Sequence, residues 1–183
     1  MMQVDEAQRE IRVAFMGGGP GAIVSALVWV VAALFHSTSG TQAAFVALFF
    51  GGWLIFPLSV VVCRLVFTRS ASVAGNPLGL LCLESTIAMI ACLLAAWLLL
   101  PARADIVFPI AALAVGTHYF AFKTAYGDRT YWLLAAIITG LGLAGLFWLP
   151  GQSLPLILAV AAVEFVFGIA LVMGNRASEP TGA

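Results

Sequence analysis

Six long runs of apolar residues dominate the chain, and each is long enough to cross a lipid bilayer as a helix of about 20 residues. The runs cover residues 20–36, 43–67, 77–100, 106–126, 131–149 and 154–173. Only 9% of the 183 residues are charged, whereas a soluble domain uses roughly a quarter to cover its surface. We therefore predict an all-α polytopic membrane protein in which residues 17–173 form a bundle of six transmembrane helices.

The connections between the runs are short, so neighbouring helices should be antiparallel. Arg103 falls on one side of the predicted membrane, and the other seven basic residues fall on the opposite side: Arg9, Arg12, Arg64, Arg69, Lys123, Arg129 and Arg176. Short loops rich in Lys and Arg stay in the cytoplasm. We therefore predict that both termini are cytoplasmic. Small and aromatic residues recur in the even-numbered helices, and three related hairpins would explain this pattern.

Both ends of the chain differ from the apolar runs. Residues 1–16 alternate apolar and charged residues near helical spacing, which predicts a short amphipathic helix on the cytoplasmic membrane surface. The sequence Gly-Gly-Gly-Pro-Gly at 17–21 then breaks the chain before it enters the bilayer. Residues 174–183 are polar, and we expect a disordered cytoplasmic tail.

Three ionisable residues stand out within the apolar runs, away from the ends of the predicted helices: Glu84, His118 and Glu164. Such groups are costly in contact with lipid, so they should face the bundle or a wet cavity. The first interpretation is that they line a path for a small polar solute, an ion or a proton, with Tyr119 nearby. The alternative is that they hold the helices together, with each group paired inside the bundle.

Three further polar residues near the predicted inner surface are candidates for the same path. Arg64 and Lys123 lie within a turn or two of that surface, where they can reach water or pair with Glu84. Asn76 precedes the proline that begins the third run, so its helix N-terminus is suited either to an anion or to an ordinary cap.

Several functions find no support in the sequence. The net charge is zero, which gives no electrostatic argument for a nucleic-acid partner. The three cysteines, Cys63, Cys82 and Cys92, form no CxxC pair and no zinc pattern. No catalytic motif of an intramembrane protease, no metal site and no cofactor motif is present. The sequence therefore favours a protein that is not an enzyme.

A set of short motifs resembles a family of uncharacterised bacterial multi-pass membrane proteins. The motifs are EAQREIR at 6–12, GGPG at 18–21, IFPL at 55–58, GNPL at 75–78, LEST at 83–86, TAYG at 124–127 with YW at 131–132, and EFVFG at 164–168. The resemblance spans nearly the whole chain. It implies a location in the bacterial cell inner membrane and carries no established activity.

The hypothesis that these observations favour is a small-solute or ion transporter or channel with a polar site in the cytoplasmic half of the bundle. The competing hypothesis is a membrane scaffold, sensor or partner subunit that does not transport. Stripes of small residues, such as Ala136, Gly140 and Ala144, favour close helix contacts between copies of the chain. We therefore expect a homo-oligomer within the lipid bilayer.

Overall fold

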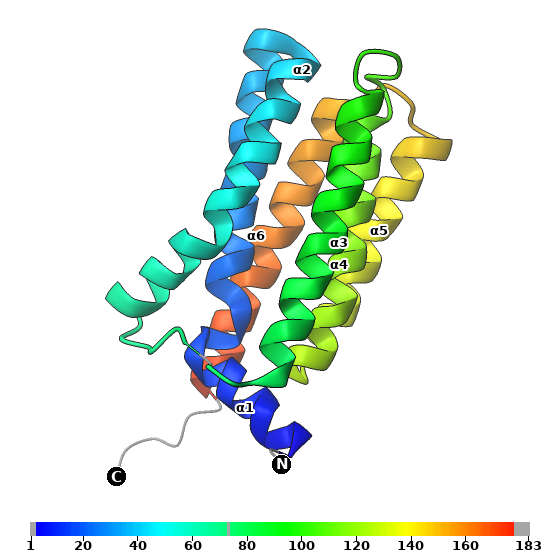
Figure 1. Ribbon diagram of the computed structural model, residues 1–183. Coiled ribbons are helices and arrows are strands. Elements are labelled where there is room, and N and C mark those ends of the chain that lie inside the picture. Colours follow the sequence, from blue (N-terminus) through cyan, green and yellow to red (C-terminus); the bar gives the residue numbers. More distant parts are fainter. Residues whose placement is uncertain (1–2, 73, 178–183) are drawn as a thin grey trace.

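The structure is a computed structural model that describes residues 3–72 and 74–177. Within these residues it is built of helices and loops, without strands (Figure 1). The helices are α1 (Val4–Ala14), α2 (Gly19–Leu65), α3 (Pro77–Leu99), α4 (Val107–Tyr126), α5 (Thr130–Phe147) and α6 (Ser153–Ala177), with a 3-10 turn at Met16–Gly18. Four of them, α2, α3, α5 and α6, are long and apolar enough to cross a membrane. The polar residues Thr117, His118 and Lys123 make α4 less apolar than these four.

The long helix α2 contains two of the predicted helices and reverses direction between them. Gly40 has φ 84° and ψ −179°, a conformation that a residue with a side chain rarely adopts. At this point the chain turns back on itself (Figure 1). A Cβ on Gly51 would touch Val28, and one on Gly21 would touch Ser59, as antiparallel pairing requires. We call residues 19–39 the first arm of α2 and residues 41–65 its second arm.

The reversal at Gly40 and the two upper loops, at 100–106 and 148–152, lie at one end of the bundle, which we call the hairpin end (Figure 1). The opposite end, which we call the elbow end, contains α1, the glycine-rich turn, the α2–α3 and α4–α5 connections and the end of α6. The seven basic residues other than Arg103 all belong to elbow-end segments. Arg103 lies at the hairpin end and pairs with Asp105 at 2.9 Å.

Glycines bring two pairs of helices into close contact. A Cβ on Gly116 of α4 would lie 2.6 Å from the backbone nitrogen of Thr139 on α5. On α6, a Cβ at Gly168 would lie 3.1 Å from the carbonyl oxygen of Gly19 on the first arm of α2. Backbones can approach this closely only where side chains are absent. These contacts join α4 to α5 and α2 to α6.

The helix α3 lies at the edge of the bundle. Only 6% of the most apolar 18-residue stretch of α3 is buried, the smallest share among the four helices that are long and apolar enough to cross a membrane. It packs mainly along α4. Near the hairpin end, Trp97 also meets the rings of Phe45, Phe49 and Phe50 on the second arm of α2. Most of its circumference is therefore uncovered.

The amphipathic helix α1 forms, but its apolar face packs on the protein. Ala7, Ile11 and Ala14 are 1–3% exposed, and α1 crosses the elbow end beneath α3 and α4 (Figure 1). At the other terminus, α6 continues to Ala177, so helix extends into the segment that we expected to be disordered. Residues 178–183 of that segment lie outside the described residues.

Candidate functional site

The centre of the candidate site is Glu164, near the middle of α6. Its side chain is 0% exposed, and Oε1 accepts a hydrogen bond of 2.8 Å from the hydroxyl of Tyr119 on α4. Among the described residues, Oε2 has no hydrogen-bond partner, and no ion pair forms with the carboxyl. An acidic group is thus enclosed near the middle of a long apolar helix, with a hydroxyl donor instead of a cation.

Three helices contribute side chains to this cluster. Ser25 on the first arm of α2 is 6% exposed, and its hydroxyl lies near both the Glu164 carboxyl and the Tyr119 hydroxyl. Gly168, one turn after Glu164, allows the close approach of α2 that brings Ser25 there. Glu164, Tyr119 and Ser25 therefore form one buried polar cluster in an apolar core.

Two more tyrosines extend from this cluster toward the elbow end. Tyr131 at the start of α5 stacks on Tyr119, with ring centroids 6.1 Å apart. Tyr126 at the end of α4 stacks on Tyr131 at 5.3 Å. The Tyr131 hydroxyl donates a hydrogen bond of 2.7 Å to the carbonyl oxygen of Gly17. The Glu164 cluster is thus connected by aromatic contacts to the glycine-rich turn.

His118 faces away from this cluster. Its Nδ1 lies 2.8 Å from the Ser85 hydroxyl on α3, and its ring packs against Phe122 at 4.4 Å. The first interpretation placed His118 on one path with Glu84 and Glu164, but the structure gives it a serine partner at the α3–α4 contact. The pair holds the peripheral helix α3 to α4.

Glu84 is exposed on the outer side of α3, which corrects our expectation that it faces the bundle. The reason is that α3 has one main neighbour along its length. Ser85, the next residue, faces α4, and successive residues of a helix differ by about 100° in direction. The side chain of Glu84 makes no hydrogen bond or ion pair with any residue that the structure describes. Glu84 therefore lies on the outside of the bundle, whereas Glu164 lies inside it.

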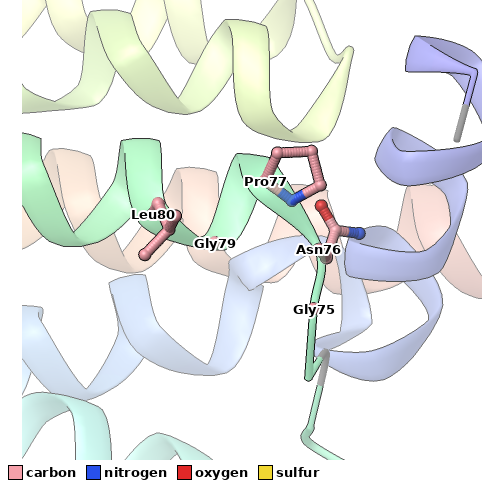
Figure 2. A pocket seen from close by; sticks show the side chains of 5 residues that line it. All are labelled: Gly75, Asn76, Pro77, Gly79 and Leu80. Carbon is pink, nitrogen blue, oxygen red and sulfur yellow. The ribbon is translucent and has the colours of Figure 1, made fainter. Parts of the chain in front are cut away.

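Asn76 is buried and fully occupied by contacts with the protein. Its Oδ1 accepts from the backbone nitrogen of Leu78 and so caps α3. Its Nδ2 donates to the carbonyl oxygen of Ala7 at 2.9 Å and to Glu10 Oε2 at 2.7 Å. In Figure 2 the side chain points toward α1, beside an open hollow of about 350 Å³. The carboxylate of Glu10 therefore lies near the N-terminus of α3, the position that the sequence made a candidate for binding an anion. Asn76 acts as the cap of α3 and as a link to α1.

Replacing Asn76 with alanine should release α1 from the bundle. The change removes the α3 cap, whose loss typically costs about 1 kcal/mol, and both hydrogen bonds to α1. Hydrogen–deuterium exchange read by mass spectrometry should show faster exchange in residues 4–14, with α5 unchanged as the internal reference. Unchanged protection of α1 in Asn76→Ala would show that its buried apolar face is sufficient to hold it.

The two basic candidates lie at the elbow end and do not approach Glu164. Arg64 is exposed, and its Nε donates to the Ser70 carbonyl oxygen at 3.3 Å. Lys123 is half-buried near the end of α4. Neither forms an ion pair with Glu84 in the described part of the chain. Of the seven residues predicted for the path, the structure brings together Glu164 and Tyr119.

Sequence reasoning missed Ser25, Tyr126 and Tyr131. A serine in an apolar run is a weak signal, because its hydroxyl can bond to its own helix. The tyrosines carried a better signal: the chain has three, and all lie between residues 119 and 131. A buried tyrosine usually finds a partner for its hydroxyl, so this clustering indicated a polar centre.

Comparison with known proteins agrees with the resemblance found in the sequence. The chain belongs to a family whose description is "Family of unknown function (DUF7010)", and the match covers residues 4–174. No curated protein and no solved structure matches the chain.

Proposed function

We propose that the chain is a six-span protein of the bacterial cell inner membrane, with both termini in the cytoplasm. The two arms of α2 and the helices α3 to α6 would each cross once, with the elbow end cytoplasmic. The position of the basic segments at that end supports this orientation. Exposed Trp132 and Trp148 lie near opposite ends of α5, where aromatic residues meet the membrane interfaces.

We further propose that this protein is a proton-linked carrier of a small solute or ion, with Glu164 as the proton-binding group. The observation that carries this proposal is the fully buried Glu164 carboxyl, which has a tyrosine donor, an unpaired oxygen and no cation partner in the described residues. An ionisable residue inside a membrane protein is rare because it is costly, and function is the usual reason for its presence.

The chemistry of the cluster suits reversible proton binding. A neutral carboxyl can stay in a dry core, whereas an ionised one needs compensation. The Tyr119 hydroxyl can donate to a carboxylate, and Ser25 adds a second hydroxyl from another helix. Loss of the proton would favour entry of water or a cation between α2, α4 and α6. This gives a link between protonation and helix separation, which a carrier requires.

Flux measurements in proteoliposomes test this function. Vesicles containing the purified protein and a pH-sensitive dye are exposed in turn to inorganic cations, inorganic anions, small carboxylates and amino acids. We expect at least one class to change the internal pH with the wild type, to do nothing with Glu164→Gln, and to act normally with Glu84→Gln. The proposal fails if no class exceeds protein-free vesicles, or if Glu164→Gln behaves like the wild type.

A second candidate role is that of a partner subunit in a membrane complex, and the exposed Glu84 favours it. A carboxyl on the outside of a spanning helix is costly unless another polar group covers it. Ala136 and Gly140 on α5 are also exposed, as a helix contact between copies would need. Subunit counting by single-molecule photobleaching in bilayers distinguishes an oligomer from a monomer. Oligomers that dissociate in Gly140→Leu support self-association through α5, and monomers throughout contradict it.

A further inference from the structure

All three tyrosines of the chain stand in one buried row. Tyr119, Tyr131 and Tyr126 are 1–7% exposed, and their rings stack in that order with interplanar angles near 30°. The row begins at Glu164, near the middle of α6, and ends at the glycine-rich turn of the elbow end. It therefore spans the distance between the buried carboxyl and one end of the bundle.

Two hydroxyl groups of the row, those of Tyr131 and Tyr126, lie beside the backbone of the turn. Tyr131 donates to the carbonyl oxygen of Gly17. A Cβ on Gly18 would overlap the Tyr131 hydroxyl and lie 3.2 Å from the Tyr126 hydroxyl. The two hydroxyls are thus near enough for one water to bridge them, and a side chain at position 18 would fill that space. Gly18 also has φ 79°, which favours glycine on conformational grounds.

The surroundings of the row are otherwise apolar. Phe122 packs against the rings of Tyr119, Tyr126 and Tyr131. Glu164 lies at one end of the row and Arg12 at the other. Other titratable groups near it are Cys63 beside Tyr126, Asp128 beside Tyr131, and Cys82 near both of these tyrosines. Each tyrosine hydroxyl in this core can donate one hydrogen bond and accept others, so it can pass a proton on.

We propose that the tyrosine row is the route by which Glu164 exchanges its proton with the elbow-end solvent. This inference rests on the proposed role of Glu164 as a proton-binding group. In each step a hydroxyl gives its proton to a bridging water on one side and receives one from the other side. For Tyr131 this requires that its hydroxyl turn from the Gly17 carbonyl oxygen toward the water. The tyrosines end in their starting state, so no charge or electron is left on the row.

The helix α1 covers the outer end of this route. Arg12 Nη1 donates to the carbonyl oxygen of Tyr126 at 2.5 Å, and Gln8 Nε2 donates to that of Thr124 at 2.8 Å. Both bonds tie α1 to the last turn of α4, next to the final tyrosine. Access from solvent to Tyr126 therefore depends on how tightly α1 is held.

Infrared spectroscopy of the protein in bilayers tests the route. A protonated buried carboxyl gives a C=O stretching band that shifts when its proton is replaced by deuterium. We identify the Glu164 band as the one absent in Glu164→Gln, and follow its shift after a change to D2O. The expected result is exchange slower by roughly tenfold or more in Tyr131→Phe and in Tyr126→Phe, because a missing relay group removes a proton-transfer step.

Thr139→Val is the matched control, because Thr139 has a buried hydroxyl on α5 with no partner in the described residues and lies outside the row. It should exchange like the wild type. The Tyr126 hydroxyl makes no hydrogen bond with the described part of the chain, so its removal should disturb the fold less than removal of the Tyr131 hydroxyl. Tyr126→Phe therefore still tests the route if Tyr131→Phe fails to fold. Wild-type exchange rates in every folded tyrosine variant overturn the proposal, as does the absence of a Glu164 band.

The test separates this inference from the carrier proposal. Slowed exchange without any solute-dependent pH change supports the route and contradicts the carrier. Solute-dependent flux that Glu164→Gln abolishes, together with unchanged exchange in the tyrosine variants, supports the carrier and overturns the route.

Discussion

Gly116→Ala is expected to lower the free energy of unfolding by about 2 kcal/mol, although it adds a single methyl group. The new Cβ would lie 2.6 Å from both the backbone nitrogen and the Oγ1 of Thr139. Backbone cannot move aside as a side-chain tip can, so α4 and α5 must separate. This cost exceeds the gain of up to roughly 1 kcal/mol that alanine brings to a helix interior.

Gly140→Ala is the matched control for this change. Gly140 lies on α5, is exposed, and a Cβ there meets no atom within 4 Å. We expect its stability to equal or slightly exceed that of the wild type. Unfolding in mixed micelles with increasing SDS, followed by circular dichroism, measures both variants. Equal stability of Gly116→Ala and Gly140→Ala would show that the α4–α5 contact is looser than the structure indicates.

Tyr119→Phe is expected to destabilise the protein by about 2 kcal/mol, because it leaves a buried carboxyl without its donor. The phenylalanine ring can keep the stacking on Tyr131, so the loss isolates the hydroxyl. In the wild type that hydroxyl gives Glu164 Oε1 its hydrogen bond at 2.8 Å. After the change, Ser25 would be the hydroxyl left beside the carboxyl.

A double-mutant cycle with Glu164→Leu measures how much of this loss belongs to the pair. Glu164→Leu removes the carboxyl and keeps an apolar side chain of similar length. In that background Tyr119→Phe should cost less than in the wild type, giving a coupling of about 1 kcal/mol or more. Additive effects of the two changes would indicate that the hydroxyl and the carboxyl do not depend on each other.

The same variants bear on transport. If Glu164 binds a proton during flux, Tyr119→Phe should alter the solute-dependent pH changes under conditions in which the variant is still folded. A loss of flux in Glu164→Gln with a normal circular dichroism spectrum separates chemistry from folding. Glu84→Gln is the comparison in both assays, because Glu84 stands outside the bundle.

The helices were predictable because hydropathy and chain length act locally. Three of the predicted runs match helices of the structure to within two residues at each end. They are 77–100 for α3, 106–126 for α4 and 131–149 for α5. The reversal between the first two runs was also predicted. The structure places it at Gly40, whose backbone is non-helical, and the two arms of α2 join there without an intervening loop. Whether six passes cross a membrane stays a prediction.

The candidate site was predicted only in part. Glu164 and Tyr119 were among the seven residues proposed for a path, and the structure joins them. Glu84 shared with Glu164 the two properties that made both candidates: a carboxyl group and an apolar surrounding in the sequence. The difference is that α6 packs against α2 and α5, whereas α3 packs mainly against α4.

By itself, the sequence determined the helical class, the short reversals and the side on which basic residues gather, because each depends on residues close together in the chain. The tertiary structure alone decided which polar groups meet. Which polar groups meet depends on how each helix is rotated about its own axis and on how many helices pack against it. The hydropathy of the sequence specifies neither. Glycine contacts bring α2 to α6 and α4 to α5. Glu164, Tyr119 and Ser25 thereby come together while Glu84 remains outside.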